Sequence, residues 1–116
     1  MARILNAPGS MNTFLMLTRL APGAAPSPAA LEHLEKNVME RIRSDCPGIE
    51  WRSNFAVLGP WDYVDIFDAP DLETALKVST IVRLFGYAHT EVWSLQEWGR
   101  FKDLIRHLHA VPTESG

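Results

Sequence analysis

The first half of the chain passes from the apolar pattern of a strand to that of a helix. Residues 12–19 form an apolar run too short for a helix, and both of its parities are apolar, which predicts a central strand covered on both faces. A stripe with offsets of three and four follows at Leu31, Leu34, Val38 and Ile42. We expect this helix to begin at Ser27-Pro28 and to end at Cys46-Pro47-Gly48.

The middle of the chain predicts a hairpin followed by a second helix. Residues 49–58 alternate between apolar and polar positions, as in a half-buried strand. The turn residues Gly59-Pro60 predict that residues 61–68 return antiparallel to that strand. Asp68 or Asp71 is expected to cap the second helix, which ends at Gly86 in a left-handed conformation.

The end of the patterned region predicts one more strand and one more helix. Residues 87–93 alternate again, and Ser94 to Glu97 has the spacing of a capping box, in which serine and glutamate satisfy each other's free amides. The helix behind it carries its apolar side chains on one side, at Trp98, Phe101, Leu104, Ile105 and Leu108. Gly99 weakens this helix by about 1 kcal/mol relative to alanine, so the helix depends on docking.

The order of elements predicts an α+β fold of the ferredoxin-like kind. The order β-α-β-β-α-β gives a four-stranded antiparallel sheet with two helices on one face, followed by a C-terminal helix. We expect residues 11–110 to form this single domain, with residues 1–10 as a flexible extension and residues 111–116 as a flexible tail.

Composition and charge narrow the possible partners. The net charge is −3 and the pI is about 5.7, so no overall positive field attracts nucleic acid or an anionic membrane. Cys46 is the only cysteine, which excludes an intramolecular disulfide. The sequence contains no run of about eighteen apolar residues, so it predicts no transmembrane helix. We therefore expect a cytoplasmic protein. Because the sequence has no phosphate loop, dinucleotide glycine pattern or paired-cysteine metal motif, we expect no cofactor and no metal.

The two faces of the predicted sheet differ in character. We expect the helices to cover the face formed by Val64, Ile66, Ala88, Thr90 and Val92. The opposite parity holds Tyr63, Asp65, Phe67, Tyr87, His89, Glu91 and Trp93, which would expose several aromatic rings in a monomer. Because exposed apolar patches mark interaction sites, we expect a second subunit to pack sheet against sheet, with the C-terminal helix over part of the rim.

Candidate chemistry lies on this second face. A histidine oriented by a carboxylate can act as a general base, so His89 and Asp65 are the candidate catalytic residues. Together with Glu91 they could also ligate a divalent metal, although a structural or interface role is the commoner one for such a trio. Asp62 follows the turn and is expected to bind backbone amides rather than to act as an acid.

The stretch 58–71, LGPWDYVDIFDAPD, resembles the signature of the GYD domain family. Gly59, Trp61 and Asp62 occupy the positions of the name-giving motif, with tryptophan in place of the usual tyrosine. Residues 17–20 and 90–91 resemble the family as well, so the similarity spans roughly residues 12–101. The resemblance implies a dimeric α+β barrel, in which two ferredoxin-like sheets close around an interior. It implies no particular activity.

Three functions remain open from the sequence. The first is the binding of a small molecule at the sheet face or dimer interior, in a pocket lined by Tyr63, Asp65, Phe67, His89, Glu91 and Trp93. The second is a cofactor-independent enzyme acting on a small aromatic substrate, by analogy with monooxygenases among similar dimeric barrels. The third is a structural module for dimerisation. The acidic balance argues against RNA binding at the sheet face.

Overall fold

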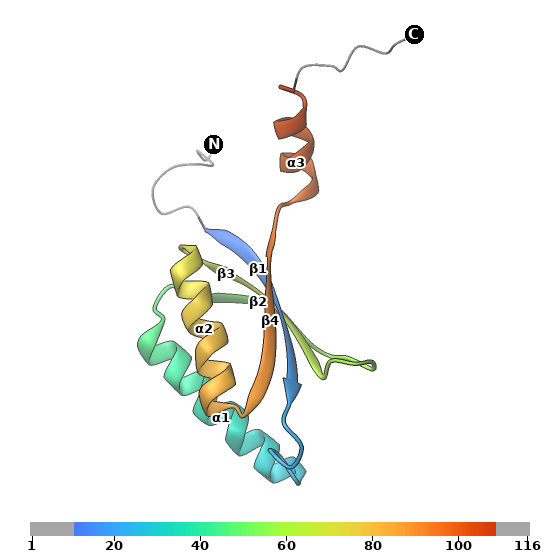
Figure 1. The fold of residues 1–116 in the computed structure, drawn as a ribbon. Helices are drawn as coiled ribbons and strands as arrows, with labels where there is room; N and C mark the ends of the chain where they lie inside the picture. Colours follow the sequence, from blue (N-terminus) through green and yellow to red (C-terminus); the bar gives the residue numbers. More distant parts are fainter. Residues whose placement is uncertain (1–10, 109–116) are drawn as a thin grey trace.

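The computed structural model describes residues 11–108 and shows a ferredoxin-like α+β fold (Figure 1). The elements are β1 (Asn12–Leu20), α1 (Pro28–Asp45), β2 (Glu50–Ala56), β3 (Tyr63–Ala69), α2 (Leu72–Phe85), β4 (Ala88–Leu95) and α3 (Trp98–Ile105). The four strands form one antiparallel sheet in the order β2-β3-β1-β4. The extension at 1–10 and the tail at 111–116 lie outside the described residues.

Helices α1 and α2 begin where the sequence places capping side chains. The Ser27 hydroxyl accepts a hydrogen bond from the Ala30 amide at 3.1 Å, and Pro28 occupies the first turn. The Asp71 carboxylate accepts a hydrogen bond from the Thr74 amide at 2.7 Å. Both predicted helix starts are therefore confirmed. Among the described helices, none is long and apolar enough to cross a lipid bilayer.

Gly86 ends α2 as expected, but for a different physical reason. Its φ of −97° is an ordinary right-handed value, and Tyr87 takes the left-handed conformation with φ 51°. The glycine is required by close approach, because a Cβ at this position would lie 2.5 Å from the Val82 carbonyl oxygen and 3.4 Å from Val38 Cγ2. A side chain at residue 86 would therefore push against both α1 and α2.

The start of α3 differs from the predicted capping box. Ser94 and Leu95 continue β4, and the cap is Glu97, whose carboxylate accepts a hydrogen bond from the Arg100 amide at 2.9 Å. The strand continues because Thr13 of β1 pairs with Leu95, which holds residues 94 and 95 in the sheet. Figure 1 shows α3 extending beyond the end of β4, away from the other helices.

The two helices of the main layer lie at different heights above the sheet. The backbone of α2 approaches β1, β3 and β4, whereas no Cα atom of α1 comes within 8 Å of a Cα atom in any strand. Small residues on α2, such as Ala75 and Ser79, are buried and permit the close approach. Helix α1 faces the sheet with larger side chains, including Leu34, Met39 and Ile42.

The expected division of the sheet into faces is confirmed for β4 and wrong for β3. Thr90 of β4 bonds Ser79 of α2, so this strand turns Thr90 toward the helices and His89 and Glu91 away from them. On β3, however, Phe67 is fully buried under the helices, and Val64 and Ile66 project to the other face. Both parities of β3 are apolar, so the sequence pattern does not specify which one faces inward.

We predict that Gly86→Ala lowers the free energy of unfolding by about 1–3 kcal/mol, because the added methyl group overpacks the contact with Val82 and Val38. Gly59→Ala is the matched control, since its Cβ would meet nothing closer than a Val57 methyl at 4.0 Å. Urea denaturation of both variants measures the difference. Equal stabilities for the two would contradict the packing argument.

Candidate functional site

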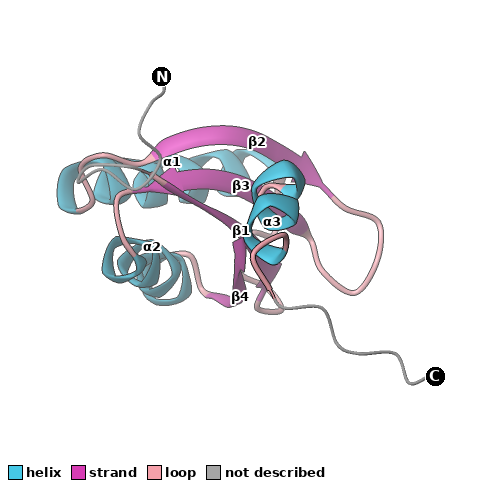
Figure 2. Ribbon diagram, turned by 90° about the horizontal axis from the view of Figure 1, so that it is seen from above, coloured by secondary structure: helices cyan, strands magenta, loops and turns pink. Residues whose placement is uncertain are grey.

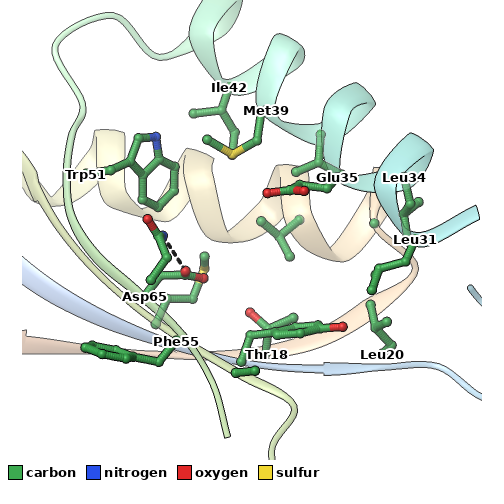
Figure 3. A pocket seen from close by; sticks show the side chains of 17 residues that line it. Thr18, Leu20, Leu31, Leu34, Glu35, Met39, Ile42, Trp51, Phe55 and Asp65 are labelled. Atoms are coloured by element: carbon green, nitrogen blue, oxygen red, sulfur yellow. Dashed lines mark hydrogen bonds between the residues drawn. The ribbon is translucent and has the colours of Figure 1, made fainter. Parts of the chain in front are cut away.

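A cavity of about 390 Å³ lies between α1 and the sheet. It exists where α1 is held off the strands, and apolar side chains form most of its wall (Figure 3). From α1 these are Leu31, Leu34, Val38, Met39 and Ile42. Asn54 and Ala56 of the edge strand β2 line it and are exposed, so solvent reaches the cavity from this edge.

A few polar side chains interrupt the apolar wall. Asp65 of β3 accepts a hydrogen bond from the Asn54 side-chain nitrogen, with 2.6 Å between Nδ2 and Oδ1. Glu35 lies on the side of α1 that faces the cavity, as Figure 3 shows. Burial raises the pKa of Asp65 above its usual 3.8, the Asn54 hydrogen bond opposes the shift, and the nearby Glu35 charge adds to it.

Tyr63 adds a phenol to the same wall. Burial raises the pKa of its hydroxyl above the usual value, with further contributions from the negative charges of Asp62 and Glu35. The phenol therefore stays protonated at neutral pH. It can donate as well as accept a hydrogen bond at the cavity wall.

Thr18 of β1 is a polar residue in this wall whose hydroxyl has no partner within residues 11–108. Its side chain is only 5% exposed, and its Oγ1 is buried without a hydrogen bond. An unsatisfied buried hydroxyl costs about 1–3 kcal/mol, so such groups usually meet a water molecule or a ligand. This unpaired hydroxyl belongs to a residue that lines the cavity.

The wall carries acidic groups and no basic side chain. None of its lining residues is lysine, arginine or histidine, whereas Glu35 and Asp65 are both present. The arginines on the neighbouring strands are held elsewhere: Arg52 pairs with Asp68 at 2.7 Å, and Arg19 lies over the Trp61 ring. The wall therefore holds two acidic side chains and no positive charge to balance them.

The structure separates the six residues that the sequence placed in one pocket. Tyr63 and Asp65 line the cavity, while Phe67 is buried in the core, where its ring stacks on Phe14 at 5.7 Å. The other three, His89, Glu91 and Trp93, project from the opposite face of the sheet.

His89 is therefore not oriented by Asp65, which corrects the expectation that these two candidates share a face. Its ring stacks on Trp61, with 5.8 Å between centroids. A general base made of this histidine and this carboxylate is absent from the described structure. Nor do any three His, Cys, Asp or Glu side chains between residues 11 and 108 gather as a metal site would require.

Sequence reasoning missed Thr18 and Glu35, whereas it did place Asn54 beside Asp65. A signal was present for Glu35, because this acid falls next to Leu34 and Val38 in the apolar stripe of α1. Thr18 likewise interrupts an apolar strand. Both are polar residues in the pattern of a buried face, and such positions point to a cavity or a hydrogen-bonded core.

The motif around Asp62 has a structural role. Its carboxylate accepts a hydrogen bond from the Leu20 amide at 2.8 Å, and its own amide donates to the Thr18 carbonyl at 2.8 Å. These contacts fasten the β2–β3 loop to the end of β1. The expectation that Asp62 binds a backbone amide is confirmed.

The face of the sheet opposite the helices is apolar at its centre. We call it the open face, and its half-buried centre consists of Leu15, Leu17, Val64 and Ile66. Phe55 on β2 and Trp93 on β4 flank this centre and are 57% and 49% exposed. None of the described helices covers the open face, as Figure 2 shows for α1 and α2.

The fold and the cavity define a ferredoxin-like α+β domain with a hollow between its first helix and its sheet. A comparison with known protein families matches the GYD domain over residues 14–105. The chain therefore belongs to the GYD domain family. A comparison with curated proteins finds no match.

We predict that Asp65→Asn raises the stability of the protein at pH 7. Because the folded-state pKa of Asp65 lies above 3.8, the folded protein binds this proton more tightly than the unfolded chain. Ionisation therefore costs stability as pH rises above 3.8, and the neutral amide avoids that cost. The gain should vanish at about pH 3, where the carboxyl is protonated in both states.

Asp71→Asn is the control with the opposite sign. Hydrogen bonds from Thr74 lower the pKa of Asp71, so this substitution should lose stability at pH 7. Urea denaturation at the two pH values measures both variants. A loss of stability in Asp65→Asn at pH 7 would contradict the assignment of burial as the main cause.

Proposed function

We propose that the protein binds a small, largely apolar molecule in the cavity between α1 and the sheet, and that this molecule is neutral or cationic. The observation that carries the proposal is the Thr18 hydroxyl, buried without a hydrogen-bond partner in the wall of a mostly apolar cavity. A bound molecule with one hydrogen-bonding group would satisfy it. The remaining apolar wall would hold the body of the molecule.

The size of the cavity supports this use. Binding sites for small molecules have volumes of roughly 300–1,000 Å³, with mostly apolar walls and few polar groups. This cavity, at about 390 Å³, falls at the small end of that range. Tyr63 and the Asn54–Asp65 pair provide the further polar groups that would fix the orientation of the bound molecule.

The charges of the wall select against anions. A carboxylate or phosphate entering the cavity would lose its hydration and meet Glu35 and Asp65, with no cation in the wall to replace the lost water. An alcohol could bond Thr18 at no such cost. An ammonium group would be attracted by both acids.

We also infer that two copies of the chain associate through their open faces. In the described monomer, Phe55 and Trp93 remain exposed on either side of an apolar centre. A two-fold interface is self-complementary, so each apolar centre would pack against its own copy. The body of the cavity lies on the helix side of the sheet, away from this association, and Phe55 borders both surfaces.

The binding proposal is tested with three compounds of one carbon skeleton: phenylpropylamine, phenylpropanol and phenylpropanoate. We expect the amine and the alcohol to bind with a Kd of about 1 mM, as befits fragments of this size. The carboxylate should bind at least about tenfold more weakly, because of its charge. NMR titration measures all three, and shifts are expected at Thr18 and Tyr63. Absence of binding by all three would contradict the proposal.

A pair of threonine variants separates binding from stability. Thr18→Val should stabilise the fold, since it removes an unsatisfied hydroxyl, and should weaken phenylpropanol binding about three- to tenfold. Thr90→Val is the control, because it breaks the 2.7 Å bond to Ser79 and lies outside the cavity wall. It should lower stability and leave binding to the folded protein unchanged.

Association through the open face is tested by the double variant Phe55→Lys, Trp93→Lys. We expect the dimer Kd from sedimentation equilibrium to rise at least about tenfold, because four charges would be buried at the interface. Leu84→Lys is the control, since Leu84 is at least as exposed as Phe55 and Trp93 but lies on α2. A wild-type protein that stays monomeric at millimolar concentration would contradict the association.

A further inference from the structure

We propose that α3 is an arm that docks on a second copy of the chain and completes the dimer. The inference rests on the association through the open face proposed above. It gives a role to α3, the one described helix that packs against no other element, and it extends the interface beyond the sheet.

Helix α3 has an apolar side with no partner among residues 11–108. None of its Cα atoms lies within 8 Å of a Cα atom in another described helix or strand, and each of its residues is at least partly exposed. Trp98 at the start of the helix and Leu104 near its end are 65% and 53% exposed. Within the helix, the Trp98 ring stacks only on Phe101, at 5.3 Å.

A helix of this length does not persist alone in water. It contains eight residues, whereas isolated helices shorter than about 12–15 residues are marginal. Gly99 weakens it further. The fully exposed Glu97 cap is too weak to hold so short a helix by itself, so α3 needs a surface on which to dock.

The short connection to β4 directs α3 away from its own subunit. Only Gln96 and Glu97 separate the strand from the helix, and Glu97 holds extended angles of −60° and 140° while it caps the helix. Figure 1 shows the resulting helix continuing past the end of the sheet. Folding back onto its own open face would break the cap and reverse the chain within two residues.

The apolar side of α3 continues the open face. Trp93 and Leu95 share the outward parity of β4, and Trp98 follows directly after the connection. The exposed aromatic side chains of this stretch each present on the order of 100 Å². A stable dimer buries about 800 Å² per partner, so the arm adds a substantial share to what the sheet provides.

The polar side of α3 also bears on the choice of partner. Arg100, Lys102 and Arg106 lie there, and Arg106 pairs with Asp103. A basic amphipathic helix can bind an anionic membrane, but such helices are usually longer, and the chain as a whole has a net charge of −3. The continuity with an unpartnered apolar sheet favours a second copy.

The test places a lysine on either side of α3 in the full chain. Phe101→Lys and Leu104→Lys should each raise the dimer Kd at least about tenfold, since each puts a charge into the interface. Asp103→Lys, on the polar side, is the control and should change the Kd less than about twofold, because its exposed pair with Arg106 contributes little. Circular dichroism confirms that each variant is folded.

Hydrogen exchange of the α3 amides distinguishes a failure of the proposed arm from a failure of the proposed sheet interface. Protection that rises with protein concentration and is lost in Phe55→Lys, Trp93→Lys supports docking on a second copy. A wild-type dimer with unprotected α3 amides and no effect of the lysines overturns the arm while the sheet interface stands. Protection in the monomer, or only with phosphatidylserine vesicles, also overturns it. A wild-type monomer at all concentrations overturns both.

Discussion

The height of α1 above the sheet is the constraint on which the candidate site depends. Helix α2 lies close to the sheet because Ala75 and Ser79 let its backbone approach the strands. Helix α1 meets the sheet through longer side chains, and its Cα atoms stay more than 8 Å from those of the strands. Gly86 fixes the contact between the two helices, because a side chain there would strike Val82 and Val38. The hollow beneath α1 is thus a consequence of close packing on one side and spacing on the other.

The chemistry of the cavity follows from which polar groups this spacing leaves unpaired. Asn54 satisfies Asp65 in part, and Asp62 is occupied by the Leu20 amide, but the Thr18 hydroxyl has no partner in the described structure. Because the neighbouring arginines face other groups, nothing in the wall offsets the charge of the two acids. The proposed selectivity against anions therefore depends on the absence of basic side chains from the wall as much as on the positions of the hydrogen-bonding groups.

The open face and α3 pose one physical problem between them. Each presents apolar surface to solvent in the isolated chain, and only two residues separate β4 of the open face from α3. A sheet with one bare apolar face is stable in water when something covers that face. Pairing of two copies would solve the problem for both surfaces at once. It would leave the cavity on the outer, helical side of each sheet.

The sequence alone determined the elements, their order and the family, because helix caps, turn residues and apolar periods act locally. Ser27, Asp71 and the clean alternation of β4 each specify their structure without distant contacts. Only the tertiary structure decided the face of β3, since both of its parities are apolar and its orientation comes from pairing Phe67 with Phe14 and Asp65 with Met16 of β1. The orientation of β3 in turn determines the site, because it places Asp65 in the cavity wall while His89 lies on the open face. Glu35 and Thr18 joined Asp65 from distant positions in the chain, and only packing could bring them together.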